Sequence, residues 1–189
     1  MSGKKSAKEW DEKGVILYKL GKYEDAIKCY NKALSISPNY AFVWKDKGDT
    51  LYKLGKYEES FKCYEKTSEI GAYVAFHWIE IGVTFAKIFQ YSYAIKCFDK
   101  ELEINPNNTR TWKYKGDVLY KLGKYKEAIK CFDKAMMFFG IMEGYLFRFQ
   151  VWHNKGNALK KLGKFEEAKK CCDEAREIKM QKKKFLLRG

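Results

Sequence analysis

The side chains in this sequence with the clearest capacity for chemistry are six cysteines, because thiolates form disulfides and bind zinc. Cys29, Cys63, Cys97 and Cys131 follow one another at intervals of 34 residues, and Cys171 holds the equivalent position of a fifth copy. Equivalent positions in stacked helical units lie about 8–10 Å apart or more, whereas a disulfide needs Cα atoms within about 7 Å. The spacing also lacks the close cysteine pairs of a zinc site. We therefore predict structural thiols that pack as small apolar side chains, with neither a disulfide nor a bound metal.

Other residues that could support catalysis lack the partners that catalysis needs. His77 and His153 are the only histidines, and neither has a partner histidine at ligand spacing. The stretch from Gly156 to Gly163 and Lys164 resembles a phosphate-binding loop. Its glycines are, however, seven residues apart instead of five, and Phe follows the lysine where Ser or Thr is needed. The carboxylates occupy positions expected to be solvated. The sequence thus predicts a protein without enzymatic activity and without a cofactor.

The cysteine interval belongs to a longer repeat. Trp10, Trp44, Trp78 and Trp112 are also 34 residues apart, and Trp152 follows after 40. Each tryptophan is followed by Gly four residues later and by Leu or Phe three residues further on, and three copies continue with Leu-Gly-Lys-Tyr. The first copy contains the full set of repeated residues, which are Trp10, Gly14, Leu17, Leu20-Gly21-Lys22-Tyr23, Ala26, Tyr30, Ala33 and Pro38.

This pattern resembles the tetratricopeptide repeat (TPR) family, whose 34-residue unit is a helix–turn–helix. The resemblance covers roughly residues 7–178. It implies an all-α fold, an α-solenoid of five helix–turn–helix repeats that forms a right-handed superhelix. It also implies a single array over residues 1–189, with repeats at about 7–40, 41–74, 75–108, 109–142 and 149–182, an insertion at 143–148 and a basic C-terminal tail at 179–189. The Lys-rich, Arg-poor composition further resembles TPR proteins of methanogenic archaea.

Local signals predict where the helices begin and end. Ser6 and Glu9 form a capping box, so the first helix should begin at about residue 7, and Gly21 should end it. Ten helices, two per repeat, are expected. Phe89 replaces this glycine in repeat three, and because Phe disfavours a positive φ we expect a different turn there. The apolar residues 136–149 either lengthen the second helix of repeat four or form an apolar plug between repeats four and five.

The net charge is +14, of which +12 falls on residues 109–189. This basic half favours acidic partners and leaves RNA or another nucleic acid as the alternative partner. Only four of the 38 basic residues are Arg, the side chain preferred for phosphate and base contacts, which speaks against that alternative. No apolar run reaches the ~18 residues of a membrane span, and the N-terminus lacks the apolar region of a secretory signal. We therefore expect a cytoplasmic protein without a membrane partner.

The TPR resemblance implies that a partner peptide binds in a concave groove lined by the first helix of each repeat. The predicted groove residues are Phe42, Lys45, Phe76, Ile79, Val83, Arg110, Lys113, Tyr114, Asp117, Tyr120, Lys121, His153, Asn157 and Lys160. Their character changes from mixed and acidic, through apolar in repeat three, to basic in repeats four and five. We therefore predict a protein–protein interaction scaffold for an acidic segment with an apolar anchor. The anchor would lie over Phe76, Ile79 and Val83, and the carboxylates over the basic residues.

The carboxylate clamp of chaperone cofactors, the best-known function of the family, is not predicted. That clamp needs Lys after the Trp position and Asn after the Gly position of one repeat, followed by Asn, Lys and Arg in the next two. The best register begins at Lys45, but it places Asp49 and Glu80 where asparagines are needed. Two acids would then face the basic positions. The sequence leaves the oligomeric state and the identity of the partner open.

Overall fold

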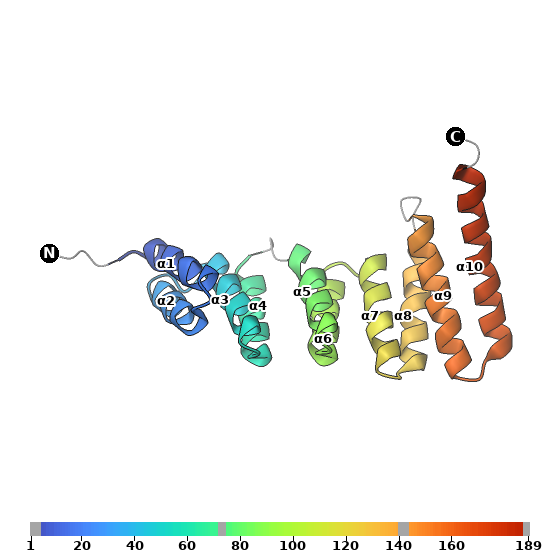
Figure 1. The fold of residues 1–189 in the computed structure, drawn as a ribbon, viewed down its shortest axis with the longest axis horizontal. Coiled ribbons are helices and arrows are strands. Elements are labelled where there is room, and N and C mark those ends of the chain that lie inside the picture. Colours follow the sequence, from blue (N-terminus) through green and yellow to red (C-terminus); the bar gives the residue numbers. More distant parts are fainter. Residues whose placement is uncertain (1–4, 72–74, 140–143, 187–189) are drawn as a thin grey trace. The chain divides into compact units, whose positions relative to one another are not determined.

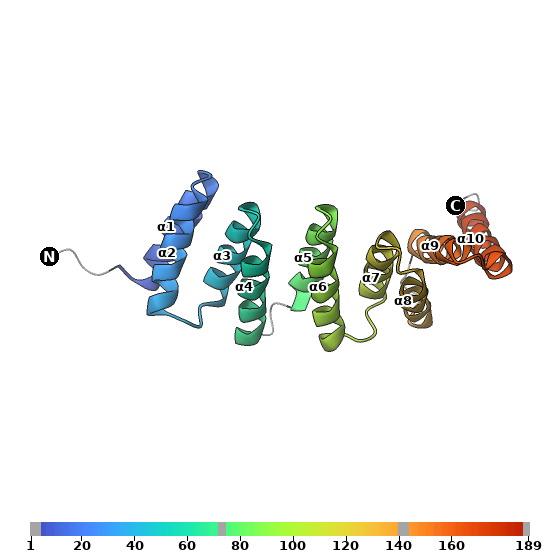
Figure 2. The same ribbon diagram turned by 90° about the horizontal axis from the view of Figure 1, so that it is seen from below.

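A computed structural model of the chain describes residues 5–71, 75–139 and 144–186, with side-chain environments for all of these except 75–77 and 181–186. The chain divides into two compact units, Met1–Phe76 and His77–Gly189, and each is described by itself. The described residues form ten α-helices and no strand (Figure 1 and Figure 2). The predicted all-α fold with two helices per repeat is therefore confirmed.

The first unit contains two pairs of helices. They are α1 (Ala7–Lys19) with α2 (Tyr23–Ile36), and α3 (Ala41–Lys53) with α4 (Tyr57–Ile70). The helices of each pair pack on one another, and α3 also packs on α2 and touches α1. Ala26, Tyr30 and Ala33 of α2 are buried in one cluster with Val43 of α3. Each repeat thus completes its core with residues of the next one, as expected for a repeat array.

The second unit contains six helices. They are α5 (Ala75–Lys87), α6 (Tyr91–Ile104), α7 (Thr109–Lys121), α8 (Tyr125–Met137), α9 (Tyr145–Lys161) and α10 (Phe165–Leu186). From α6 to α10 each helix packs on the next, and α7 also contacts α9. This last contact brings together the first helices of repeats four and five, which carry the candidate site. None of the helices in the described ranges is long and apolar enough to cross a membrane.

The helix ends follow the predicted signals. Ser6 caps α1: its backbone N–H donates to Glu9 Oε2 at 2.7 Å, and the backbone N–H of Glu9 donates to Ser6 Oγ at 3.3 Å. After the helix, Gly21 has a φ of 74°, a left-handed conformation that glycine adopts without a Cβ penalty. Both predictions are confirmed.

The turn at Phe89 contradicts the prediction of a different turn. Phe89 has a φ of 63°, so it adopts the left-handed conformation of the glycines at this position. Gln90 N–H donates to the carbonyl of Phe85 at 2.9 Å, just as Lys56 N–H donates to that of Leu51 at 3.0 Å. The backbone hydrogen bonds of the turn, together with the packing of the helix pair, therefore override the preference of the phenylalanine.

Replacing Phe89 with Gly should stabilise the protein by about 1 kcal/mol, because a non-glycine residue in the left-handed region costs about 1–2 kcal/mol. The ring offsets little of this cost, since 74% of Phe89 is exposed. Urea denaturation followed by circular dichroism measures the change. A Phe89→Ala variant should gain nothing, because alanine retains the Cβ atom. A stabilisation as large in Phe89→Ala as in Phe89→Gly would show that the ring, and not the backbone, carries the strain.

Within the described residues, none of the six cysteines forms a disulfide. Five of them are buried, and Cys172 is half-buried. Burial raises the pKa of Cys63 and of Cys131 to about 11, which keeps both thiols protonated near neutral pH. Within the described ranges, no three His, Cys, Asp or Glu side chains lie together as metal ligands would. The five cysteines at the repeated position are therefore buried, as predicted for packing residues.

The apolar segment 136–149 behaves only partly as predicted. It does not lengthen the second helix of repeat four, because α8 ends at Met137 and has 13 residues. It lengthens the first helix of repeat five instead, since α9 begins at Tyr145 and has 17 residues. Phe139 and Phe147 pack against the core of α7 and α8, with ring centroids 6.0 Å apart. The plug interpretation therefore describes these two rings, while residues 140–143 lie outside the described residues.

Candidate functional site

Four of the predicted groove residues line one hollow between α7 and α9. The hollow has a volume of about 310 Å³, and its lining consists of Asp117, Tyr120, Lys121, Asn154 and Asn157. On α7, Asp117, Tyr120 and Lys121 share a face because they are spaced by three and four residues. Asn154 and Asn157 share a face of α9 for the same reason. The contact between the first helices of repeats four and five thus forms a polar hollow. A hydrogen bond across it joins Asn154 to Asp117, which are 37 residues apart in the sequence.

The carboxylate of Asp117 is held from two sides. Lys113 Nζ lies 2.8 Å from Asp117 Oδ2, and Asn154 Nδ2 donates to Oδ1 at 2.7 Å. Lys113 is only 9% exposed, so this ion pair is largely removed from solvent. Lys121, by contrast, is exposed, and its Nζ lies 6.0 Å from the ring centroid of Tyr91. The charge of Asp117 is therefore compensated within the protein, and Lys121 makes the hollow electropositive.

The other predicted residues of the second unit lie outside the lining of this hollow. Arg110 and Lys160 are exposed. Tyr114 stacks on Phe98 with ring centroids 6.1 Å apart, and the exposed His153 stacks on Phe149 at 5.6 Å. On α5, Ile79 and Val83 are half-buried, whereas the side chain of Phe76 lies outside the described residues.

Asn154 is the lining residue that was not among the predicted groove residues. Two features of the sequence could have identified it. It lies three residues before Asn157, so both amides face the same side of the helix. It also occupies the position two residues after the repeated Trp, where the earlier repeats carry Asp, Glu or Tyr.

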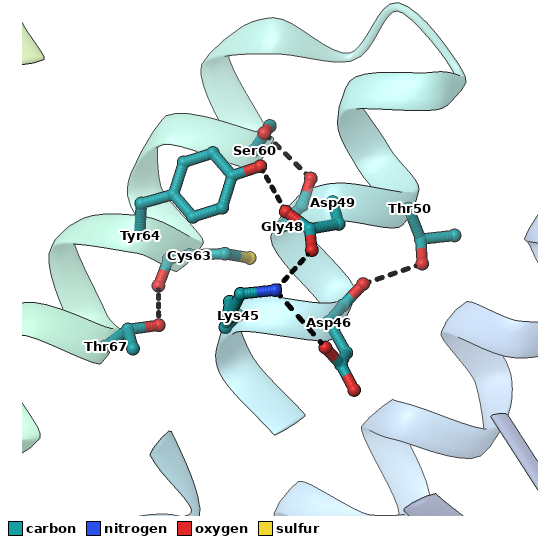
Figure 3. Close-up of polar contacts among 9 residues, drawn as sticks. All are labelled: Lys45, Asp46, Gly48, Asp49, Thr50, Ser60, Cys63, Tyr64 and Thr67. Atoms are coloured by element: carbon teal, nitrogen blue, oxygen red, sulfur yellow. Dashed lines mark hydrogen bonds and ion pairs between the residues drawn. The ribbon is translucent and has the colours of Figure 1, made fainter. Parts of the chain in front are cut away.

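The first unit holds its predicted lysine in the same way (Figure 3). Lys45 Nζ lies 2.7 Å from Asp49 Oδ2 and 3.7 Å from Asp46 Oδ1, and Tyr64 Oη donates to Asp49 Oδ1 at 2.8 Å. Burial raises the pKa of Asp46 to about 6, an effect that Lys45 opposes and the carboxylates of Asp11 and Asp49 reinforce. Lys45 is thus surrounded by acids and is not available to a carboxylate ligand. The predicted Phe42 is 64% exposed on the same helix.

Lys45–Asp49 and Lys113–Asp117 occupy equivalent positions in their repeats, one residue after the Trp and one after the Gly. Both lysines are partly removed from solvent, with side-chain exposures of 36% and 11%. A lysine and an aspartate four residues apart on a helix favour such a pair. These two predicted ligands are therefore bound to their own helix, which distinguishes them from Lys121.

Sequence comparison identifies the repeat. A family model described as Tetratricopeptide repeat matches residues 7–40, 109–137 and 149–179, and a second model with the same description matches residues 29–62. Together these matches extend over more than half of the chain. A comparison with curated proteins gave no match.

Solved structures share the fold. The chain is similar to the MamA protein, with a TM-score of 0.64, 19% identity and coverage of 95% of this chain and 94% of that one. MamA 41-end from Desulfovibrio magneticus RS-1 gives a TM-score of 0.58 and 16% identity, with coverage of 93% of this chain and 96% of that one. YrrB, described as a TPR protein with an unusual peptide-binding site, gives a TM-score of 0.58 and 21% identity, with coverage of 89% of this chain and 84% of that one. At these identities the likeness establishes a common helical-repeat fold.

Proposed function

We propose, from the premise that the chain belongs to the tetratricopeptide repeat family, that it binds an extended acidic segment of a partner protein in the hollow between α7 and α9. The family and the fold support a protein-interaction scaffold. The observation that carries the finer proposal is the hollow of about 310 Å³ whose one carboxylate, Asp117, is already paired with Lys113 and Asn154. The uncompensated charge there belongs to Lys121.

The lining supplies the contacts that an extended segment needs. Asn157 carries both a donor and an acceptor, which can pair with the backbone C=O and N–H of a peptide. The ring of Tyr120 offers an apolar surface beside them, and Lys121 attracts a carboxylate. Apolar residues of the segment would extend towards Ile79 and Val83 on α5, which are half-buried and uncharged.

Lys113 has a supporting role in this proposal. Its ion pair holds Asp117 in place, and Asp117 in turn orients the amide of Asn154 at 2.7 Å. Substituting Lys113 would disturb the site indirectly, so its effect on binding cannot be separated from an effect on folding. The direct tests therefore use Lys121 and Asn157. We further propose that the protein acts by binding alone, in the cytoplasm, which agrees with the generally non-enzymatic character of TPR scaffolds.

A matched pair of lysine variants tests the proposal. The probe is a short fluorescein-labelled peptide of alternating Glu and Leu, titrated with the full chain and followed by fluorescence anisotropy. Lys121→Gln and Asn157→Ala should each weaken binding about fivefold, which corresponds to about 1 kcal/mol. Lys53→Gln should change it less than twofold, because Lys53 holds the same position in repeat two but lies outside the hollow.

Two results would overturn the proposal. Equal weakening by Lys53→Gln and Lys121→Gln would show diffuse attraction to a basic surface. A labelled RNA oligonucleotide that binds more tightly than the peptide, with an affinity that falls steeply with salt, would favour nucleic acid as the partner. Titrations of both probes at two salt concentrations separate these outcomes.

A further inference from the structure

The first helix of repeat one exposes an apolar residue, Ile16, at a position that three of the other repeats bury. Ile16 is 59% exposed and Leu20 is 65% exposed. The residues equivalent to Ile16 in repeats two, four and five, Thr50, Val118 and Ala158, are 0%, 4% and 0% exposed. In repeat three the equivalent Thr84 is exposed, and it is polar. A helix face that no neighbouring repeat covers should be polar, so the exposed isoleucine of repeat one indicates a contact surface.

In repeats four and five the first helix packs on the second helix of the preceding repeat. The second helix of the preceding repeat contributes an isoleucine and, four residues later, an aspartate. On α6, Ile95 packs against the core of α7 and α8, and Asp99 Oδ1 lies 2.5 Å from Lys115 Nζ. On α8, Ile129 packs against the core of α9 and α10, and the next ion pair joins Asp133 to Lys155 at 2.6 Å.

Repeat one contains the lysine of this contact. Lys13 holds the position of Lys115 and Lys155, three residues after the repeated Trp. Between α1 and α2 a hollow of about 240 Å³ is lined by Trp10, Lys13, Leu17, Asp25, Lys28, Cys29 and Lys32. The ammonium groups of Lys13 and Lys32 lie 5.5 and 4.3 Å from the centroid of Trp10. The face is thus apolar with a positively charged border.

We propose that this N-terminal face, formed by Trp10, Lys13, Ile16, Leu17 and Leu20, docks an amphipathic helix of a partner protein. The helix carries an aliphatic residue and, four residues later, a carboxylate. The aliphatic side chain covers Ile16 and enters the hollow beside Trp10, and the carboxylate pairs with Lys13. Three lysines of the hollow face the carboxylate and one carboxylate, Asp25, opposes it, but Asp25 is already paired with Lys28 at 2.8 Å.

The chain's own last helix fits this face poorly, which favours a different protein over a second copy. On α10, Lys169 replaces the isoleucine of α6 and α8, and it is exposed. It would place a third ammonium group beside Lys13 and Lys32. The aspartate at the next required position, Asp173, is paired with Arg176 at 3.0 Å.

The experiment uses the chain's own docking helix as a probe. The probe is a synthetic copy of residues 91–104 with Cys97→Ser, labelled with fluorescein and stapled between positions 96 and 100, because unstapled helices of this length are marginal in water. Titration with the full chain should give saturable binding. Ile16→Asp should weaken it more than about tenfold, whereas Lys53→Glu, on the exposed surface of α3, should change it less than about twofold.

A charge reversal tests the register. Lys13→Glu should weaken binding about fivefold, and a probe with Asp99→Lys should restore it on that variant alone. Circular dichroism confirms that each variant is folded. The proposal is overturned by the absence of saturable binding at about 1 mM probe, by binding that Ile16→Asp does not affect, or by failure of the reversed pair to restore it. Sedimentation of the unliganded chain as a dimer that Ile16→Asp disperses would assign the face to a second copy instead.

Discussion

Gly116→Ala is expected to lower the free energy of unfolding by about 2 kcal/mol. A Cβ atom at position 116 would lie 2.6 Å from Cε1 and 2.9 Å from Cδ1 of Phe132. The ring of Phe132 is 0% exposed, so it has no free space into which to move. Overpacking of this kind costs typically 1–3 kcal/mol. Replacing glycine with alanine inside a helix gains about 1 kcal/mol at most, which the steric cost exceeds. Urea denaturation followed by circular dichroism measures the difference.

The last repeat provides the matched control. Gly156 holds the same position as Gly116, but Cys172 replaces the aromatic residue of the second helix. A Cβ atom at position 156 would meet Cys171 Cβ at 3.3 Å, and both the Ala168 carbonyl oxygen and Cys172 Sγ at 3.4 Å, which are tight contacts but far less severe than those at position 116. Gly156→Ala should therefore change the stability by less than about 1 kcal/mol in either direction. If both variants destabilise the protein equally, contact with the ring is not the reason for glycine in repeat four.

The repeat explains how much of the fold could be predicted from sequence. Five copies of one pattern establish helix pairs, because each copy repeats the same stripe of apolar residues and four of the five repeat the same terminating glycine. The turn at Phe89 was predicted wrongly, since propensity rules treat residue types one at a time. In the structure, the helix pair on either side of the turn fixes its backbone, and Phe89 follows with a φ of 63°.

The candidate site was predicted less well, because the sequence gives positions and not side-chain partners. The helical spacing grouped Asp117, Tyr120 and Lys121 on one face, and all three line the hollow. It could not show that Lys113 turns towards Asp117, at 2.8 Å, instead of towards a ligand. Nor could it show that Asn154 reaches Asp117 across the contact between α7 and α9. Side-chain partners depend on rotamers and on the packing of helices, and the spacing of residues in the sequence does not determine either.

Phe147→Glu is expected to lower the free energy of unfolding by about 3 kcal/mol. Phe147 is half-buried against the core of α7 and α8 and meets Phe139 edge to face, with centroids 6.0 Å apart. Glutamate would lose the aromatic contact and place a charge beside apolar side chains. Full truncation of a buried Phe costs about 3–5 kcal/mol, and partial exposure reduces this loss while the charge adds to it. Urea denaturation of the full chain measures the effect.

The neighbouring residue separates packing from self-association. Leu146 is 61% exposed, one position earlier on the same helix. Leu146→Glu should alter the stability by less than about 0.5 kcal/mol, because exposed substitutions rarely do more. If the exposed part of the segment is an interface between copies, Leu146→Glu should instead disperse an oligomer in sedimentation velocity, since exposed apolar patches mark interaction sites. Equal stability of both variants and the wild type would mean that Phe147 contributes no packing, and the plug interpretation would then be wrong.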